Sequence, residues 1–265
     1  MMKKAYRFYK ECLRDQIGTY AAQSAFFIIL SAIPFLMVLL SLLKYTFLGK
    51  ADLLSVMQTF CPNYLLPLLI SIVDEVYEHS AGLLSVTAVV AVWSAAKGVQ
   101  YITNGLNSVY DVDENRNWFV LRFWAIIYTL ILVMALLFLM GFMVFGKYIK
   151  NIIFKNFPQT GIWLFLGSWM KWLIGLVVLA GLFLIVFKAL PNKKLRLRNQ
   201  FAGACFTAIG WFVFSYGLSI YVNYFNGFSM YGSLTTLVLL MLWVYFCVYI
   251  LLIGGEINAF LSERA

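Results

Sequence analysis

Four polar side chains at helical spacing are the first residues in this sequence that could do chemistry. Lys97, Gln100, Asn104 and Asn107 stand at positions i, i+3, i+7 and i+10 of "WSAAKGVQYITNGLNSVYDVDENRN". Because an α-helix repeats about every 3.6 residues, this spacing predicts one polar helical face. The face is either solvated at the end of a helix or packed against other helices, and the sequence leaves both open.

A carboxylate also ends the longest apolar run of the chain. Glu256 and Asn258 follow the uncharged block 199–255 within "LLIGGEINAF". A carboxylate at such a depth is costly unless it is paired or hydrogen-bonded. We therefore predict that Glu256 pairs with a basic side chain, with Lys97 as the first choice and Arg116 or Arg122 as the next.

Residue types that serve catalysis are sparse. The one histidine, His79, has no Ser or Asp partner in a triad pattern and no zinc-ligand spacing. No Gly-rich phosphate loop is present, and "DVDEN" at 111–115 is better explained as a charged loop than as a cation site. The cysteines Cys12, Cys61, Cys205 and Cys247 show no CxxC spacing. We expect no enzyme, no cofactor and no metal site.

The composition indicates that membrane-spanning helices position these polar residues. Hydrophobic residues make up 63% of the 265 and charged residues 12%, against about 25% charged in soluble domains. The mean hydropathy is +0.87. Uncharged blocks cover 16–43, 123–146, 172–187 and 199–255, and about 20 such residues cross a bilayer as a helix. The sequence therefore predicts an all-α polytopic membrane protein.

We predict one integral membrane domain over residues 1–265 with six spans. The block 199–255 is too long for one crossing, and Asn226-Gly227 marks a turn within it. An amphipathic helix on the outer face is predicted in the segment 51–80, from Leu65, Leu68, Leu69, Ile72 and Val76. The spans are expected at about 22–43, 81–100, 122–146, 168–188, 200–223 and 233–255.

The basic residues predict the orientation. With six spans, 14 of the 20 Lys and Arg residues fall on the side of both termini and 6 on the other. The positive-inside rule then places both termini in the cytoplasm, although the outer loop 147–167 is itself basic. The net charge of +9 is explained by topology, so we expect no nucleic-acid partner.

Small residues predict where spans pack. Gly203, Gly210 and Gly217 recur every seven residues, which returns to nearly the same helical face. Such a groove lets a second membrane helix approach closely, and Gly254 and Gly255 should do the same near Glu256.

This orientation brings polar groups from four parts of the chain to the inner membrane face. Span ends contribute Gln23, Lys97, Glu256 and Asn258, and the loop after the fourth span contributes Asn192. We predict a functional polar cluster there, made of Gln23, Lys97, Asn104, Asn107, Arg116, Asn192, Glu256 and Asn258.

Five stretches in order along the chain resemble one family. They are "AAQSAFFIILSAIPFL" (21–36), "WSAAKGVQYITNGLNSVYDVDENRN" (93–117), "LPN" (190–192), "YGSLTTLVLLMLWVYF" (231–246) and "GGEINAFL" (254–261). Together they resemble the YihY/virulence factor BrkB family. The matching positions are Gln23, Pro34, Trp93, Lys97, Asn107, Tyr110, Arg116, Pro191, Asn192, Tyr231, Gly232, Glu256 and Asn258.

The resemblance implies a bacterial inner-membrane protein with six spans. Members were labelled ribonuclease BN, a label regarded as a misassignment, and others are linked to serum resistance or to export of lipopolysaccharide precursors. We expect a transporter or flippase-like protein, not driven by ATP, that acts on a lipid or other envelope component. The alternative is a non-catalytic membrane scaffold. The expected partners are membrane lipids, with anionic head groups at the basic loop "KALPNKKLRLR" (188–198); substrate and oligomeric state stay open.

Overall fold

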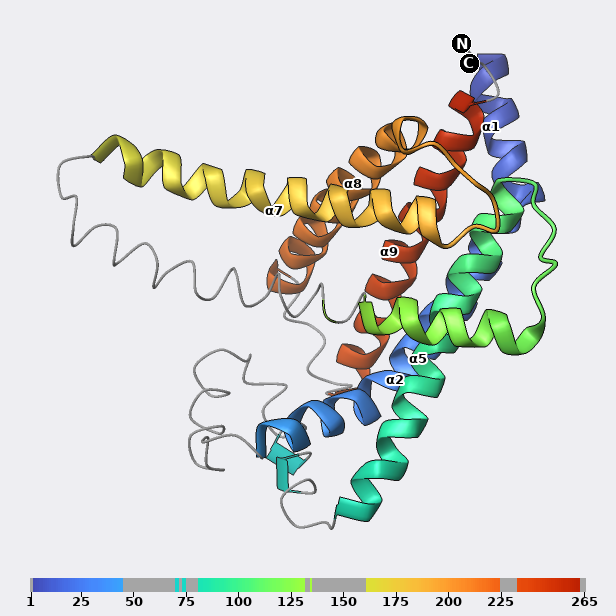
Figure 1. Cartoon of the computed structure of the whole chain (residues 1–265). Helices are drawn as coiled ribbons and strands as arrows, with labels where there is room; N and C mark the ends of the chain where they lie inside the picture. Colours follow the sequence, from blue (N-terminus) through green and yellow to red (C-terminus); the bar gives the residue numbers. More distant parts are fainter. Residues whose placement is uncertain are drawn as a thin grey trace.

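The fold is all-helical in the part of the chain that the computed structural model describes, residues 2–44, 70–71, 73–74, 81–131, 134, 161–224 and 233–262. Besides a helical segment at Trp118–Ile131, it has six labelled helices (Figure 1). They are α1 (Met2–Arg14), α2 (Ile17–Lys44), α5 (Ala81–Val109), α7 (Gly161–Ala189), α8 (Leu197–Tyr224) and α9 (Ser233–Ser262).

Five of the predicted spans lie within these long helices, α2, α5, α7, α8 and α9. Two segments in the described residues are long and apolar enough to cross a membrane, Leu197–Val222 and Leu237–Ser262. The count of six spans and the single domain over 1–265 therefore stay predictions. Of the third predicted span, residues 122–131 and 134 are described and helical. Most of the predicted outer helix lies outside the described residues.

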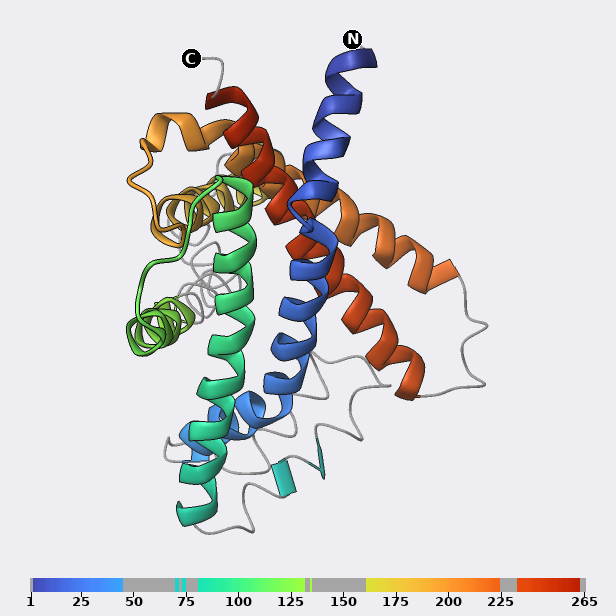
Figure 2. The ribbon, with the colours of Figure 1, turned by 90° about the vertical axis from the view of Figure 1, so that its right-hand side faces the viewer.

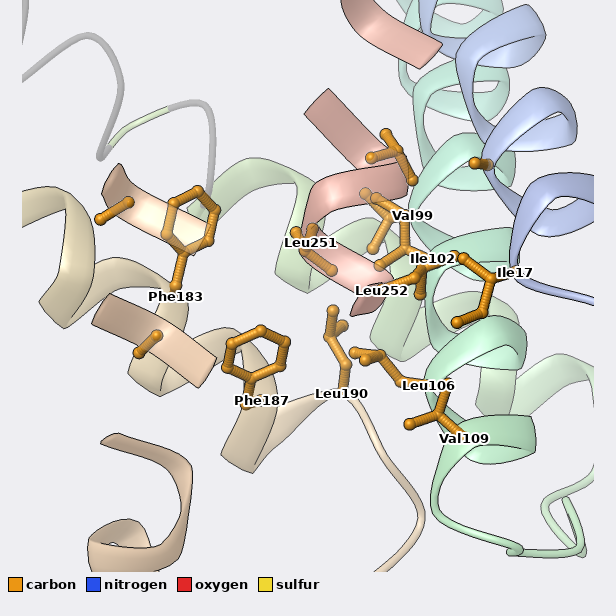
Figure 3. Close-up of a cluster of buried hydrophobic side chains, with 14 of the residues drawn as sticks. Ile17, Val99, Ile102, Leu106, Val109, Phe183, Phe187, Leu190, Leu251 and Leu252 are labelled. Carbon is orange, nitrogen blue, oxygen red and sulfur yellow. The ribbon is translucent and has the colours of Figure 1, made fainter. Parts of the chain in front are cut away.

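The core forms where α2, α5, α7, α8 and α9 meet. The helix α2 lies along α5 and α9, while α8 lies between α7 and α9 (Figures 1 and 2). Figure 3 shows Phe187 of α7, Leu106 of α5, and Leu252 of α9 converging in this cluster, and each is almost completely buried. Pro34 lies inside α2, which bends in its second half (Figure 1), as expected where a proline removes a helical hydrogen bond.

The outer faces of the bundle are also apolar. Phe201, Val213 and Tyr216 of α8 are 60–71% exposed. A helix that is hydrophobic all round must be covered by protein or by lipid. The exposed side of α8 therefore has the chemistry of a lipid-facing surface.

Glycines bring α8 and α9 into close contact, as the sequence predicts. A Cβ at Gly203 would collide with the backbone oxygen of Gly254, and one at Gly210 would lie 2.7 Å from a methyl of Ile250. A Cβ at Gly217 of the same face would meet none of the described residues within 4 Å, so the predicted groove is confirmed at two of its three positions. Gly255 faces a third helix, because a Cβ there would lie 2.8 Å from Leu106 of α5.

Both views place the start of α1 and the end of α9 at the same end of the bundle, which we call the terminal end (Figures 1 and 2). Phe8 of α1 contacts Phe260 of α9 edge-to-face, with ring centroids 5.9 Å apart. The end of α5, the end of α7 and the start of α8 lie toward the same end (Figure 1). The loops that join these helices there carry most of the polar side chains described below.

Candidate functional site

Asn107, near the end of α5, is the centre of a buried hydrogen-bond network. Its side chain is 3% exposed. Nδ2 donates to Oε2 of Glu114 at 2.7 Å, and Oδ1 accepts from the backbone N–H of Asn192 at 2.8 Å. A primary amide supplies both a donor and an acceptor. Asn107 can therefore hold the loop after α5 and the loop after α7 together.

Tyr110 extends this network to α8. Its hydroxyl donates to Oε1 of Gln200, which is 1% exposed, and its backbone carbonyl accepts from Nζ of Lys193 at 3.2 Å. Burial raises the pKa of Tyr110, so the hydroxyl keeps its proton and stays a donor. We call the set Asn107, Tyr110, Glu114, Asn192 and Gln200 the Asn107 network.

Arg116 supports the network from its exposed side. Its Nε donates to Oε1 of Glu114 at 2.7 Å, and a second guanidinium nitrogen contacts Oε2. The hydrogen bond from Arg116 holds the pKa of Glu114 below its usual value, and the same bond raises the pKa of Arg116. Glu114 is thus kept ionised, in the form that accepts from Asn107.

Asn258 fixes α9 to α8 at the glycine contact. It is completely buried, and its Oδ1 accepts from the backbone N–H of Gly203 at 2.7 Å. Gly203 has no side chain, so the Asn258 side chain can approach its backbone closely. The Nδ2 of Asn258 has no hydrogen-bond partner among the described residues. This buried side chain lies beside the side chain of Tyr110.

The prediction that Glu256 pairs with a basic side chain is wrong for all three candidates. Glu256 is 3% exposed, and its Oε2 has no donor among the described residues. The side chain beside it is another acid, Asp15, within hydrogen-bonding contact of the Glu256 carboxyl. Lys97 lies 4.9 Å over the ring of Phe27 instead, and Arg116 is held by Glu114.

Arg122, the third candidate partner, faces away from Glu256. Its guanidinium lies 4.1 Å over the ring of Trp93 and donates to the Trp93 carbonyl and, at 3.1 Å, to Oε1 of Gln100. Arg122 is 4% exposed, so it fixes the Trp118–Ile131 segment to α5. Lys97, Arg116 and Arg122 therefore all contact side chains other than Glu256.

The predicted cluster is therefore divided. Asn107, Asn192 and Arg116 come together, while Glu256 and Asn258 lie next to this network on α9. Gln23 and Asn104 are half-buried on α2 and α5 and do not join it, and Lys97 packs on Phe27. The polar stripe of α5 is packed against other segments at Gln100 and Asn107, which favours the packed reading over a solvated helix end.

Sequence reasoning missed two of the most buried polar residues, Asp15 and Gln200. Asp15 is 3% exposed and Gln200 1%. Asp15 is the last charge before the uncharged block 16–43, and Gln200 is a polar residue at the start of a span. Their positions beside apolar runs are a weak signal that could have been used.

Comparisons with known proteins show to which family the chain belongs. A family model described as "Virulence factor BrkB" matches residues 8–265. The putative ribonuclease-like protein YfkH of Bacillus subtilis (strain 168) is 35% identical over 92% of this chain and 90% of its own length.

More distant relatives carry a membrane label. A UPF0761 membrane protein of Vibrio vulnificus (strain YJ016) is 28% identical over 94% of this chain and 79% of its own. A second UPF0761 membrane protein, from Vibrio parahaemolyticus, is 25% identical over 96% of this chain and 81% of its own length. No solved structure matches the chain. The family match covers all but the first seven residues, and the chain belongs to the virulence factor BrkB family of membrane proteins.

Proposed function

We propose that this protein moves a lipid or another envelope component across the bacterial cytoplasmic membrane, as a transporter or flippase-like protein not driven by ATP. One observation carries the proposal: two polar atoms, Oε2 of Glu256 and Nδ2 of Asn258, are buried inside an apolar helical bundle and have no hydrogen-bond donor or acceptor among the described residues. Polar groups in such positions are costly, and in membrane proteins they typically mark substrate or ion pathways.

The orientation that goes with this proposal has both termini in the cytoplasm. Its support is the excess of Lys and Arg on the side of the termini and the common location of the two termini at the terminal end (Figure 2). The Asn107 network and Glu256 then lie at the cytoplasmic side.

The loop before α8 supports a lipid as the partner. Lys194, Arg196 and Arg198 are exposed and have no acidic partner among the described residues. Lysine and arginine near a membrane surface attract anionic head groups by about 1 kcal/mol each. We propose that these three side chains collect anionic lipids beside the Asn107 network.

A lipid-scrambling assay tests the function. Purified protein is placed in liposomes with fluorescent phospholipids of neutral and anionic head groups, and an impermeant quencher reports lipids that cross. We expect wild type to speed crossing and Asn107→Ala to slow it. Lys97→Met is the matched control, because it also removes a polar group from α5 but outside the network. A wild-type rate equal to empty liposomes for every lipid would overturn the proposal.

A scaffold function is the second candidate, and α1 is the observation that favours it. Tyr6, Tyr9 and Leu13 lie on one face of α1 and are 61–71% exposed, while its Phe8 face contacts α9. A scaffold predicts no lipid movement by the purified protein, and it predicts loss of a cellular phenotype in Tyr6→Ala/Tyr9→Ala. A double variant that keeps the wild-type phenotype would refute it.

A further inference from the structure

Two buried carboxyl groups from opposite ends of the chain meet at the terminal end. Asp15 lies at the turn between α1 and α2, where its backbone N–H donates to the carbonyl of Glu11 at 2.9 Å and Gln16 has a φ of 51°. Glu256 reaches it from α9. Each is 3% exposed. Neither group is placed where water can solvate a full charge.

No ion pair of Glu256 with a Lys or Arg side chain is found in the described part of the chain. Arg14 donates to Oδ1 of Asp15 at 2.8 Å, and its other nitrogen donates to Asp111 at 3.2 Å. Arg14 is therefore shared between two acids and only weakly opposes the charge of Glu256. A further carboxylate, Glu11, adds to the negative potential at Glu256, and the guanidinium of Arg7 binds that carboxylate at 2.6 Å.

The remaining titratable groups around the pair do not supply positive charge. Burial, and after it the charges of Glu256 and Asp15, raise the pKa of Cys12 to about 12, so its thiol stays neutral. Tyr110, on the α5 side, also stays neutral, because burial raises its pKa. The pair thus has acids on α1 and neutral groups on α1 and α5 as its neighbours, with Arg14 as the cation that acts on it.

We propose that Asp15 and Glu256 form a proton-binding site, which holds one proton between the two carboxyl groups and exchanges it with water at the terminal end. Two carboxylates in hydrogen-bonding contact strongly disfavour double ionisation, and such pairs titrate as a unit. The proton converts one acid into a donor, which supplies the hydrogen bond between the two side chains.

The charges balance without any further reactant. When the site is loaded, the pair carries a single negative charge that Arg14 neutralises through Asp15. Release gives one proton to water and leaves two negative charges with the same Arg14. Because Arg14 is 56% exposed, exchange occurs on its side of the pair.

A proton fits the site better than a metal ion does. The described residues contain no group of three or more His, Cys, Asp or Glu side chains arranged for a metal. Binding of a proton needs only the two oxygens that already face each other.

The site also joins elements, so its occupancy has a structural consequence. Asp15 continues the face of α1 on which Phe8 and Cys12 lie, and this face packs on α9 at Phe260. Loss of the proton puts two like charges into this contact. Deprotonation therefore weakens the packing of the α1–α2 turn against α9.

Infrared titration of the full-length protein in detergent tests the site directly. A protonated carboxylic acid has a C=O stretching band that ionised acids lack. We expect wild type to show one at neutral pH and to lose it as pH rises. Glu256→Gln and Asp15→Asn should each remove it, and Asp113→Asn, an exposed acid of the 110–117 loop, should leave it unchanged. The absence of the band in wild type, or its persistence in both pair variants, would overturn the proposal.

Stability against pH gives a second readout. The folded protein keeps a proton that the unfolded chain, with ordinary carboxyl groups near pH 4, has released. The contribution of the pair to stability is then fully present below the unfolded pKa of about 4 and is lost as pH rises toward the folded pKa, at up to tenfold in the unfolding constant per pH unit, or about 1.4 kcal/mol. Glu256→Gln should flatten this fall. A wild-type profile with the same slope as the variant from about pH 4 to the pH at which the carboxylic band disappears counts against the site. Both readouts are independent of lipid movement, so a protein that moves no lipid can still confirm this proton site.

Discussion

The glycine contact between α8 and α9 makes a sharp prediction for Gly203→Ala. A Cβ on Gly203 would collide with the backbone oxygen of Gly254 and lie 2.5 Å from Nδ2 and 2.6 Å from Cγ of Asn258. Non-bonded heavy atoms prefer about 3.5–4.0 Å, so the two helices must separate by about 1 Å. The backbone oxygen of Gly254 cannot move aside by changing a rotamer, as a side chain could.

The expected cost has two parts. Overpacking a well-packed contact costs about 1–3 kcal/mol, and separation also breaks the hydrogen bond from Gly203 N–H to Asn258, worth about 1 kcal/mol. Alanine recovers up to about 1 kcal/mol of helix propensity. We expect Gly203→Ala to destabilise the protein by about 1–3 kcal/mol.

Equilibrium unfolding in mixed detergent micelles, followed by far-UV circular dichroism, measures this change. Gly217→Ala is the matched control, since Gly217 lies on the same face of α8 and a Cβ there would have no described residue within 4 Å. It should be neutral or slightly stabilising. If both variants unfold at the same detergent composition, α8 and α9 do not contact each other as described.

Three further predictions concern the Asn107 network and Arg122. Asn107→Ala leaves the Asn192 amide without its acceptor, so we expect a loss of about 1–3 kcal/mol and faster tryptic cleavage in the 190–196 loop, which Asn104→Ala should not cause. The lowered pKa of Glu114 contributes stability that is present above its unfolded value, near 4.3, and is lost as pH falls through the folded value; Glu114→Gln should lessen this acid sensitivity in pH-dependent melting. Arg122→Lys keeps the charge but loses the planar stacking on Trp93, so it should unfold between wild type and Arg122→Met, and equal melting temperatures for all three would refute the role of the stacking.

The sequence predicted the helices well because their signal is local. Long uncharged blocks with few turn-forming residues can satisfy the hydrogen bonds of their backbone in a membrane only as helices. The seven-residue glycine period likewise predicts a packing face without knowledge of the partner, and two of the three glycines contact α9. The prediction was wrong for Gly217, because the glycine face of α8 continues past the part that α9 covers among the described residues.

The partner of Glu256 could not be predicted in the same way. The orientation argument gives the depth of a residue in the membrane but not its direction around the helix axis. Lys97 and Glu256 are both predicted near one membrane face, yet Lys97 lies over the ring of Phe27 of α2. Asp15 lies next to Glu256 because the chain turns at Gln16, which has a positive φ. This turn places the Asp15 side chain inside the bundle. Only the packing of three helices decides that contact.

The spacing of Glu256 and Asn258 on α9 links the contacts that these two residues make. Glu256 and Asn258 are two residues apart, so they point about 200° apart around the helix axis. One faces the α1–α2 turn at Asp15, and the other faces α8 at Gly203. A rotation of α9 that separates Glu256 from Asp15 must also move Asn258 from the Gly203 amide. The tight contact of Gly203 with Gly254 and Asn258 opposes such a rotation.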